Sequence, residues 1–176
     1  MQCLEIGPGK DRIGPEWVTL DCVKRPNVDH VHDIEQRMPF PDGSFDLIYA
    51  SHILEHVDWR KTVAVLKDLR RILRFGGSLE VWVPDARKII RCAIQGFIPV
   101  EEKWRESNPD NDPWTWMQGR LFAYSKPDQQ NWHRAAFSAE HLEKCLRRAE
   151  FSEIKPLTTP RAENHGWINL GIKGVK

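Results

Sequence analysis

The first residues that could do chemistry are Glu5, Gly7 and Gly9, in the heptapeptide LEIGPGK. Glycines at the end of a strand let the backbone turn sharply and come close to a ligand. The sequence contains no phosphate-binding loop of the form GxxxxGK[ST], and Arg12 stands where a dinucleotide-binding fingerprint needs its third glycine. The remaining pattern, an acidic residue, one spacer and GxG, fits both a ligand-binding loop and a simple tight turn.

Two further carboxylates follow the next predicted strands. Asp21 ends the second strand and Asp33 follows the third. One carboxylate can accept both hydroxyls of a ribose, and another can accept a hydrogen bond from an adenine amino group; a turn cap or a solvated loop acid explains each residue equally well alone. Open α/β sheets bind ligands at the carboxyl ends of their strands. Acids at three successive strand ends therefore predict a nucleoside site.

The segment HILEH suggests an alternative chemistry, because His52, Glu55 and His56 form the HxxEH pattern of an inverted zinc-peptidase helix. In that pattern two histidines on one helix share a metal and the glutamate acts as a base. A third ligand would have to come from further along the chain, with Glu140 or Glu143 as candidates. The motif directly follows a predicted buried strand and has no long helix around it. We therefore favour mutual orientation of Glu55 and His56, and expect no metal ligand.

The elements that must position these residues alternate along the chain. Short apolar runs predict strands over residues 3–6, 17–21, 28–31, 44–50 and 78–83. Between the last two, apolar residues recur at helical spacing, and Gly76 and Gly77 are expected to stop the helix. Ser138 is a candidate N-cap for a last helix, and residues 154–157 and 167–172 predict two closing strands. This alternation favours a largely parallel sheet.

A segment rich in Pro, Trp and Asn interrupts the pattern at about 86–131, with a helix expected over residues 86–95. Its apolar content is too patchy for a core, so we predict an insertion in a single domain spanning residues 1–176. The aromatic residues in and beside this segment are Trp104, Trp114, Trp116, Tyr124 and Trp132. They could form a wall for a sugar, ring or lipid-like acceptor, but we favour packing of these residues over the sheet.

Composition narrows the class of protein. The 176 residues carry 26 Lys and Arg against 25 Asp and Glu, a formal net charge of +1. Such a balance gives no overall field to attract nucleic acid or an anionic membrane. No apolar run is long enough for a membrane-spanning helix, and no signal peptide is visible. The four cysteines form no CxxC pair, which favours reduced thiols and a cytoplasmic protein.

The sequence resembles the class I S-adenosylmethionine-dependent methyltransferases, in their small-molecule, type 11-like branch. Within it, the chain is similar to a compact group of predicted methyltransferases. The motifs that carry the resemblance are LEIGPG, WVTLD, HDIEQRMPFPDGSFDLIYASHILEHV, LRRILRFGGSLEVWVPD and NWHRAAFSAEHLEKCLRRAEF. The resemblance implies a Rossmann-like α/β fold. Its sheet would have six or seven mostly parallel strands, in an order like 3-2-1-4-5-7-6.

The resemblance also implies roles for individual residues. The methionine part of S-adenosylmethionine would be held by Glu5, Gly7 and Gly9. The ribose would be held by Asp21, and the adenine by Asp33 and the backbone of Ile34. Ser51 and His52 would border the transferred methyl group. If the acceptor is a hydroxyl, His133 and His52 are the candidate catalytic bases. Surface or turn positions are expected for His30, His32, His141 and His165.

The chain departs from the family pattern in its early connections. Only KDRIGPE is available between the first two strands, so helices between the early strands are expected to be shortened or missing. A bare apolar sheet face would cost about 25 cal/mol per Å². We therefore expect the Trp-rich insertion or a second copy of the chain to cover it, and predict a homodimer through this face.

The function predicted from these observations is methyl transfer from S-adenosylmethionine to a small molecule, with a sugar or glycan precursor as candidate acceptor. No nucleic-acid or membrane partner is expected. Two other functions stay open. The first is a methyltransferase-like binding or partner module that has lost catalysis, and the second is an HxxEH zinc peptidase.

Overall fold

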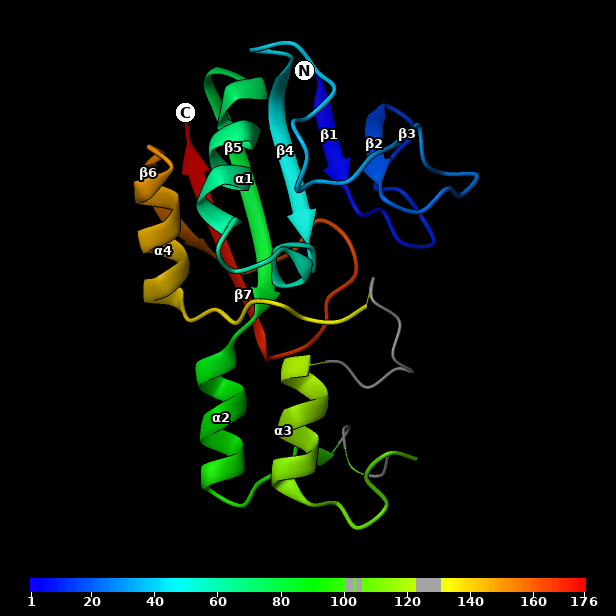
Figure 1. Ribbon diagram of the computed structural model, residues 1–176, viewed down its shortest axis with the longest axis vertical. Coiled ribbons are helices and arrows are strands. Elements are labelled where there is room, and N and C mark those ends of the chain that lie inside the picture. Colours follow the sequence, from blue (N-terminus) through cyan, green and yellow to red (C-terminus); the bar gives the residue numbers. More distant parts are fainter. Residues whose placement is uncertain (101–102, 104–105, 123–130) are drawn as a thin grey trace.

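A computed structural model describes residues 1–100, 103, 106–122 and 131–176. Its centre is one seven-stranded sheet in the order β3-β2-β1-β4-β5-β7-β6, as predicted (Figure 1). The strands are β1 (Cys3–Ile6), β2 (Trp17–Asp21), β3 (His30–Val31), β4 (Phe45–Ser51), β5 (Leu73–Pro84), β6 (Ser152–Leu157) and β7 (Asn169–Val175). Only β7 runs antiparallel to its neighbours β5 and β6. The fold is therefore the predicted Rossmann-like arrangement.

Two helices cover one face of the sheet, α1 (Thr62–Ile72) and α4 (Ala139–Arg148) (Figure 1). The side chain of Ser138 caps α4 by accepting from the backbone N–H of His141, as the sequence predicts. The apolar stripes of both helices meet alternate residues of the central strands in the main core, which includes Leu4, Ile48, Leu66, Leu69, Val81, Leu142 and Leu146. Burial of this face is what holds the strand ends, and thus the site, in place.

The opposite face carries no helix in the described part of the chain, as expected from the short early connections. Its apolar residues are nevertheless buried: Cys3, Trp17, Leu47, Tyr49 and Trp82. Ile13 and Leu157 pack against this cluster. Arg161 donates two hydrogen bonds of 2.6 and 2.7 Å to Glu80 on the same face, and the backbone N–H of Ala162 donates to the Tyr49 hydroxyl. The segments before β2 and after β6 thus cover the helix-free face of the sheet.

This cover corrects one expectation from the sequence. The described tryptophans of the insertion do not lie on the helix-free face. Trp116 is fully buried beside Ile89, Cys92 and Ile98 instead, while Trp114 and Trp132 are about half exposed. The wall proposed from the sequence also included Trp104 and Tyr124, which lie outside the described residues. The prediction that these aromatic residues pack over the sheet is therefore wrong for Trp114, Trp116 and Trp132, which the structure describes.

The described part of the insertion contains two helices, α2 (Ala86–Ile94) and α3 (Pro113–Phe122), which lie side by side beyond the carboxyl ends of the parallel strands (Figure 1). The Asp85 side chain caps α2 by accepting from the backbone N–H groups of Arg87 and Lys88. The sequence predicts α2 but not α3. Within the described ranges, no helix combines the length and apolar character needed to cross a bilayer.

The start of β5 also differs from expectation. Helix α1 ends at Ile72 because Leu73 is already extended, and β5 continues through Gly76 and Gly77. Gly76 has a φ of 76°, and a Cβ on Gly77 would lie 2.9 Å from the Arg74 carbonyl oxygen. The two glycines therefore allow an irregular strand start and do not stop the helix.

Candidate functional site

The carboxyl ends of β1, β2, β3 and β4 meet at one edge of the sheet, next to the insertion (Figure 1). Backbone hydrogen bonds continue the ladder past the strand ends. Gly7 donates to the Leu20 carbonyl at 2.8 Å, and His32 donates to the Asp21 carbonyl at 2.9 Å. The structure therefore brings the glycine loop, Asp21 and Asp33 to neighbouring positions on this edge.

The glycine loop is held in a left-handed conformation, with φ of 71° at Gly7 and 62° at Gly9. A Cβ on Gly7 would lie 2.0 Å from Cδ1 of Ile53, so this side chain needs a glycine beneath it. A Cβ on Gly9 would meet nothing within 4 Å. The backbone at Gly9 is therefore open to the approach of a ligand, whereas that at Gly7 is covered by Ile53.

Glu5 supports the loop from inside the sheet. Its carboxylate accepts a hydrogen bond from the backbone N–H of Ile13 at 2.9 Å, and only 2% of the residue is exposed. Burial raises the pKa of Glu5, since water no longer stabilises the charged form. Glu5 thus ties the far end of the loop to β1, and it does not face the open edge directly.

Asp21 and Asp33 each form a turn with the residues that follow. Asp21 accepts from the backbone N–H of Val23 at 2.9 Å and forms an ion pair with Arg25 at 2.7 Å. Asp33 accepts from the backbone N–H of Glu35 at 2.9 Å. Ile34, which lies between Asp33 and Glu35, packs against the main core. Both acids therefore have the structural role that the sequence offered as the alternative, at the edge where a nucleoside would bind.

His52 follows Ser51 at the end of β4 and has a φ of 55°. Its Nε2 lies 2.9 Å from the Asn169 Oδ1, its Nδ1 lies 3.0 Å from the Glu55 Oε1, and its ring lies 4.0 Å from that of His165. Burial opposes the charged imidazole, but the Glu55 carboxylate outweighs it and raises the pKa of His52. The same pair lowers the pKa of Glu55 against the effect of its own burial.

His133 reaches the same region from the segment that leads into α4. The backbone N–H groups of Arg134 and Ala135 both donate to the Glu55 carbonyl, at 2.6 and 3.0 Å. The Arg134 side chain pairs with Glu35 at 2.7 Å and extends to Asp58 at 3.3 Å. Burial lowers the pKa of His133, which keeps its imidazole neutral. Both candidate bases therefore lie beside Glu55.

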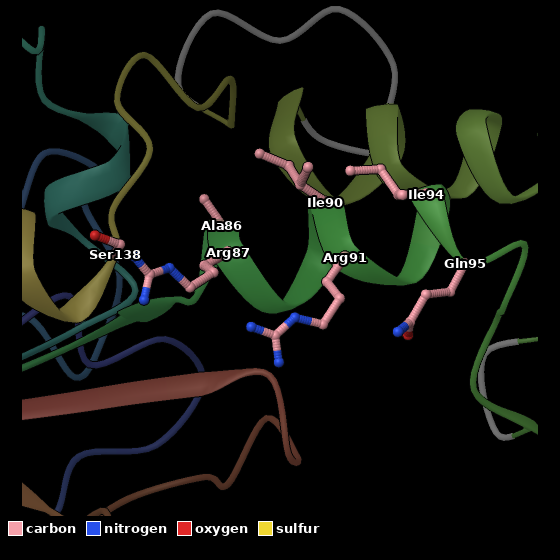
Figure 2. Close-up of a pocket in the computed structure, with 7 residues that line it drawn as sticks. All are labelled: Ala86, Arg87, Ile90, Arg91, Ile94, Gln95 and Ser138. Carbon is pink, nitrogen blue, oxygen red and sulfur yellow. The ribbon is translucent and has the colours of Figure 1, made fainter.

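Two hollows adjoin these elements. One, of about 370 Å³, is lined by Trp59, Leu121, Phe122, His133, Arg134, Ala135 and Ala136. The other, of about 540 Å³, follows α2, with Ile90 and Ile94 on one side of the helix and Arg91 and Gln95 on the other (Figure 2). The first places His133 at a cavity wall, whereas the second contains none of the predicted site residues.

The zinc-peptidase pattern is not realised. A single 3-10 turn, η1 (Leu54–His56), follows β4, and His52 precedes it in a non-helical conformation. Glu140 pairs with Arg87 and Glu143 with Arg147, so neither candidate third ligand reaches the motif. The HxxEH helix is therefore wrong as an interpretation of HILEH.

Sequence reasoning missed several residues of this region. Asn169 and His165 come from the end of the chain, and sequence reasoning gave neither of them a place beside His52. No spacing in the sequence indicates that residue 169 faces residue 52, because β7 inserts between β5 and β6 only in three dimensions.

The chain is similar in sequence to known proteins. Residues 14–81 match a family model described as a methyltransferase domain. An uncharacterized protein of Methanocaldococcus jannaschii is 39% identical over 57 residues, which cover 32% of this chain and 24% of that protein. The chain thus matches only about a quarter of the length of this curated relative.

Solved structures show the same fold. A S-adenosylmethionine-dependent methyltransferase from Thermotoga maritima aligns with a TM-score of 0.61 and 20% identity, over 99% of this chain and 82% of that one. Another from Archaeoglobus fulgidus gives 0.61 and 15%, over 99% and 86%. A 1,6-didemethyltoxoflavin N1-methyltransferase from Burkholderia thailandensis, solved with S-adenosylhomocysteine, gives 0.59 and 15%, over 99% and 70%. The predicted resemblance is thereby confirmed.

Proposed function

Because this chain carries a class I methyltransferase domain of the type 11 kind, we propose that it binds S-adenosylmethionine and transfers the methyl group to a small molecule. The observation that carries the proposal is the convergence of the glycine loop, Asp21, Asp33 and Ser51 on one sheet edge. We further propose that residues 1–176 form one such domain, with 86–131 as an insertion.

The residues at this edge fit the cofactor. The open space above Gly9 admits close approach to the main chain, which the amino-acid part of the cofactor requires. Asp21 and Asp33 offer carboxylates at successive strand ends, suited to the ribose and the adenine, respectively. The backbone of Ile34 is a further contact for the adenine. Glu5 acts through the loop that it ties down, and Ser51 and His52 border the reacting end.

The chemistry depends on geometry. When bound, the cofactor would supply a methyl group on a sulfonium: the acceptor atom bonds to this carbon in line with the carbon–sulfur bond that breaks, and S-adenosylhomocysteine leaves. The chain's own residues orient the acceptor, exclude water and remove a proton where the acceptor is a hydroxyl. His133 lines the cavity of about 370 Å³ and is kept neutral by burial, so it is suited to accept that proton. His52, held by Asn169 and Glu55, is the second candidate base.

We also propose the class of acceptor. A sugar or glycan precursor fits, because Trp59 offers an aromatic face at the cavity that contains His133. A screen of nucleotide sugars against other small metabolites, with release of S-adenosylhomocysteine as the readout, tests this class. Turnover with non-sugar acceptors alone would contradict it.

Cofactor binding itself is tested by calorimetry with S-adenosylhomocysteine. Asp21→Asn and Asp33→Asn each remove a charged acceptor, and we expect each to weaken binding about tenfold or more. Asp42→Asn is the matched control, because Asp42 precedes β4 and lies toward the opposite edge. Equal affinities for all these proteins would contradict the site. Binding without turnover on any acceptor would favour the partner module.

The homodimer and the cytoplasmic location stay predictions. The reason for the dimer was an uncovered apolar face, and that face is buried within the single chain by the segments around Ile13 and Arg161. Analytical ultracentrifugation at micromolar concentration decides the question. A monomer there would remove the dimer proposal.

A further inference from the structure

Three side chains that can bind a metal converge beside the cavity at His133. Glu55, His56 and His133 each present one ligand atom, and these atoms all lie within 4.8 Å of one another. Glu55 and His56 belong to one turn of 3-10 helix, while His133 comes from the segment that leads into α4. The two hydrogen bonds from Arg134 and Ala135 to the Glu55 carbonyl hold the two segments together.

Glu55 is the unusual member of this cluster. Only 1% of the residue is exposed. Its Oε1 lies 3.0 Å from His52 Nδ1, whereas Oε2 has no hydrogen-bond partner within the described part of the chain. A buried carboxylate in this state is costly. Its oxygens are therefore well placed for a ligand that brings positive charge.

His56 is oriented as a metal ligand commonly is. His56 Nδ1 lies 3.3 Å from the Trp132 carbonyl oxygen, so a proton on Nδ1 leaves Nε2 with a free lone pair. A histidine that binds a metal usually donates its other N–H to such a carbonyl. The rings of His56 and His133 meet edge to face, with centroids 4.9 Å apart. Both residues are half-buried, which leaves room for a further ligand on the ion.

From these observations we propose that Glu55, His56 and His133 bind a divalent transition-metal ion. Two imidazoles and one carboxylate suit Zn²⁺ and Fe²⁺, whereas Mg²⁺ and Ca²⁺ prefer oxygen ligands alone. Metal–ligand bonds of about 2.1 Å place neighbouring ligand atoms roughly 3.4 Å apart. Small side-chain rotations from the present arrangement therefore close the site. The expectation of no metal ligand is revised by this proposal.

The site lies beside the proposed acceptor cavity but does not rest on methyl transfer. With an ion bound, His133 is a ligand and no longer a candidate base. The ion would then act as a Lewis acid next to a hydroxyl acceptor. Metal binding and methyl transfer are separate measurements, so failure of one does not decide the other.

The test uses the full chain, stripped of metal with a chelator and titrated with Zn²⁺ by calorimetry. We expect one ion per chain, a rise in melting temperature with Zn²⁺, and Co²⁺ absorption bands that differ from those of the hydrated ion. Glu55→Gln, His56→Gln and His133→Gln should each weaken Zn²⁺ binding at least about tenfold. His32→Gln is the control, since the His32 ring lies 3.0 Å from the Arg37 carbonyl oxygen and outside the cluster.

Several results would overturn the site. One is wild-type binding that His133→Gln leaves unchanged. Another is loss of binding in His52→Gln but not in His56→Gln, which would assign the ion to a different pair. If a variant does not fold, as judged by circular dichroism without metal, the Co²⁺ spectrum of the wild-type protein decides. A spectrum like that of the hydrated ion means that no inner ligand comes from the chain, and the proposal fails.

Discussion

Replacement of Gly7 by alanine tests how the glycine loop is built. Alanine at φ 71° costs about 1–2 kcal/mol for the left-handed conformation. Its Cβ would also lie 2.0 Å from Cδ1 and 2.9 Å from Cγ1 of Ile53, which packs against the main core. Displacing a packed side chain costs about 1–3 kcal/mol. We expect Gly7→Ala to lower the free energy of unfolding by the sum, about 2–5 kcal/mol.

Gly9→Ala is the matched control. Gly9 has nearly the same backbone conformation, with φ 62°, but open space where the Cβ would go. It should therefore lose only the backbone contribution, about 1–2 kcal/mol. The smaller entropy of the unfolded alanine chain affects both variants alike and cancels in the difference.

Urea denaturation of both variants, in the wild-type and Ile53→Ala backgrounds, isolates the contact. Ile53→Ala removes both atoms that the new methyl group would meet, so there Gly7→Ala should cost no more than Gly9→Ala. The reasoning is refuted if the two glycine variants are equally destabilised in the wild-type background. It is also refuted if Ile53→Ala leaves the excess cost of Gly7→Ala unchanged.

Three further predictions concern stability, measured as the free energy of unfolding in urea. Arg161→Met leaves Glu80 buried without its partner and should cost about 1–2 kcal/mol, because Arg161 itself is partly exposed. Asp85→Ala removes the cap of α2 and should cost about 1 kcal/mol. Lys61 and Arg134 hold the pKa of Glu35 below its usual value against the effect of burial, so this contribution is complete above about pH 4.3 and is lost as the pH falls further.

Each of these has its own control. Arg147→Met removes an exposed ion pair on α4 and should change stability by at most about 0.5 kcal/mol; a loss as large as that of Arg161→Met would contradict the first prediction. Asp85→Asn keeps a capping oxygen and should recover most of the loss in Asp85→Ala. In Glu35→Gln the acid-induced loss should be smaller, and an unchanged pH profile would contradict the third.

Much of the fold follows from local sequence. Helices α1 and α4 could be predicted because their apolar residues recur at the spacing of one helix face. The buried strands could be predicted because short continuous apolar runs are typical of strands covered on both faces. Helix α3 could not, since Gly119 lies within it and its apolar residues do not form one stripe along the helix. Its stability comes from burying Trp116 against α2. Tertiary packing of this kind overrides local propensity.

The candidate site was predictable only in part. Strand ends carry Gly7, Asp21 and Asp33 to one edge, because parallel strands share their direction. The HILEH pattern drew attention to Glu55 and His56, but the spacing pointed to His52 as their partner. His133 reaches them through main-chain hydrogen bonds to the Glu55 carbonyl. Such bonds leave no trace in side-chain pattern, so the cluster could not be found from the sequence.

The cover of the helix-free face has a consequence for synthesis. Tyr49 and Trp82 are made early, but Arg161 and Ala162, which bond to this face, are made late. Until those residues and β7 leave the ribosome, the growing chain exposes Tyr49 and Trp82 to water, and β5 lacks its neighbour β7. We expect nascent chains halted before residue 158 to recruit chaperones that recognise aromatic segments, and chains extended by a linker that lets β7 emerge to release them.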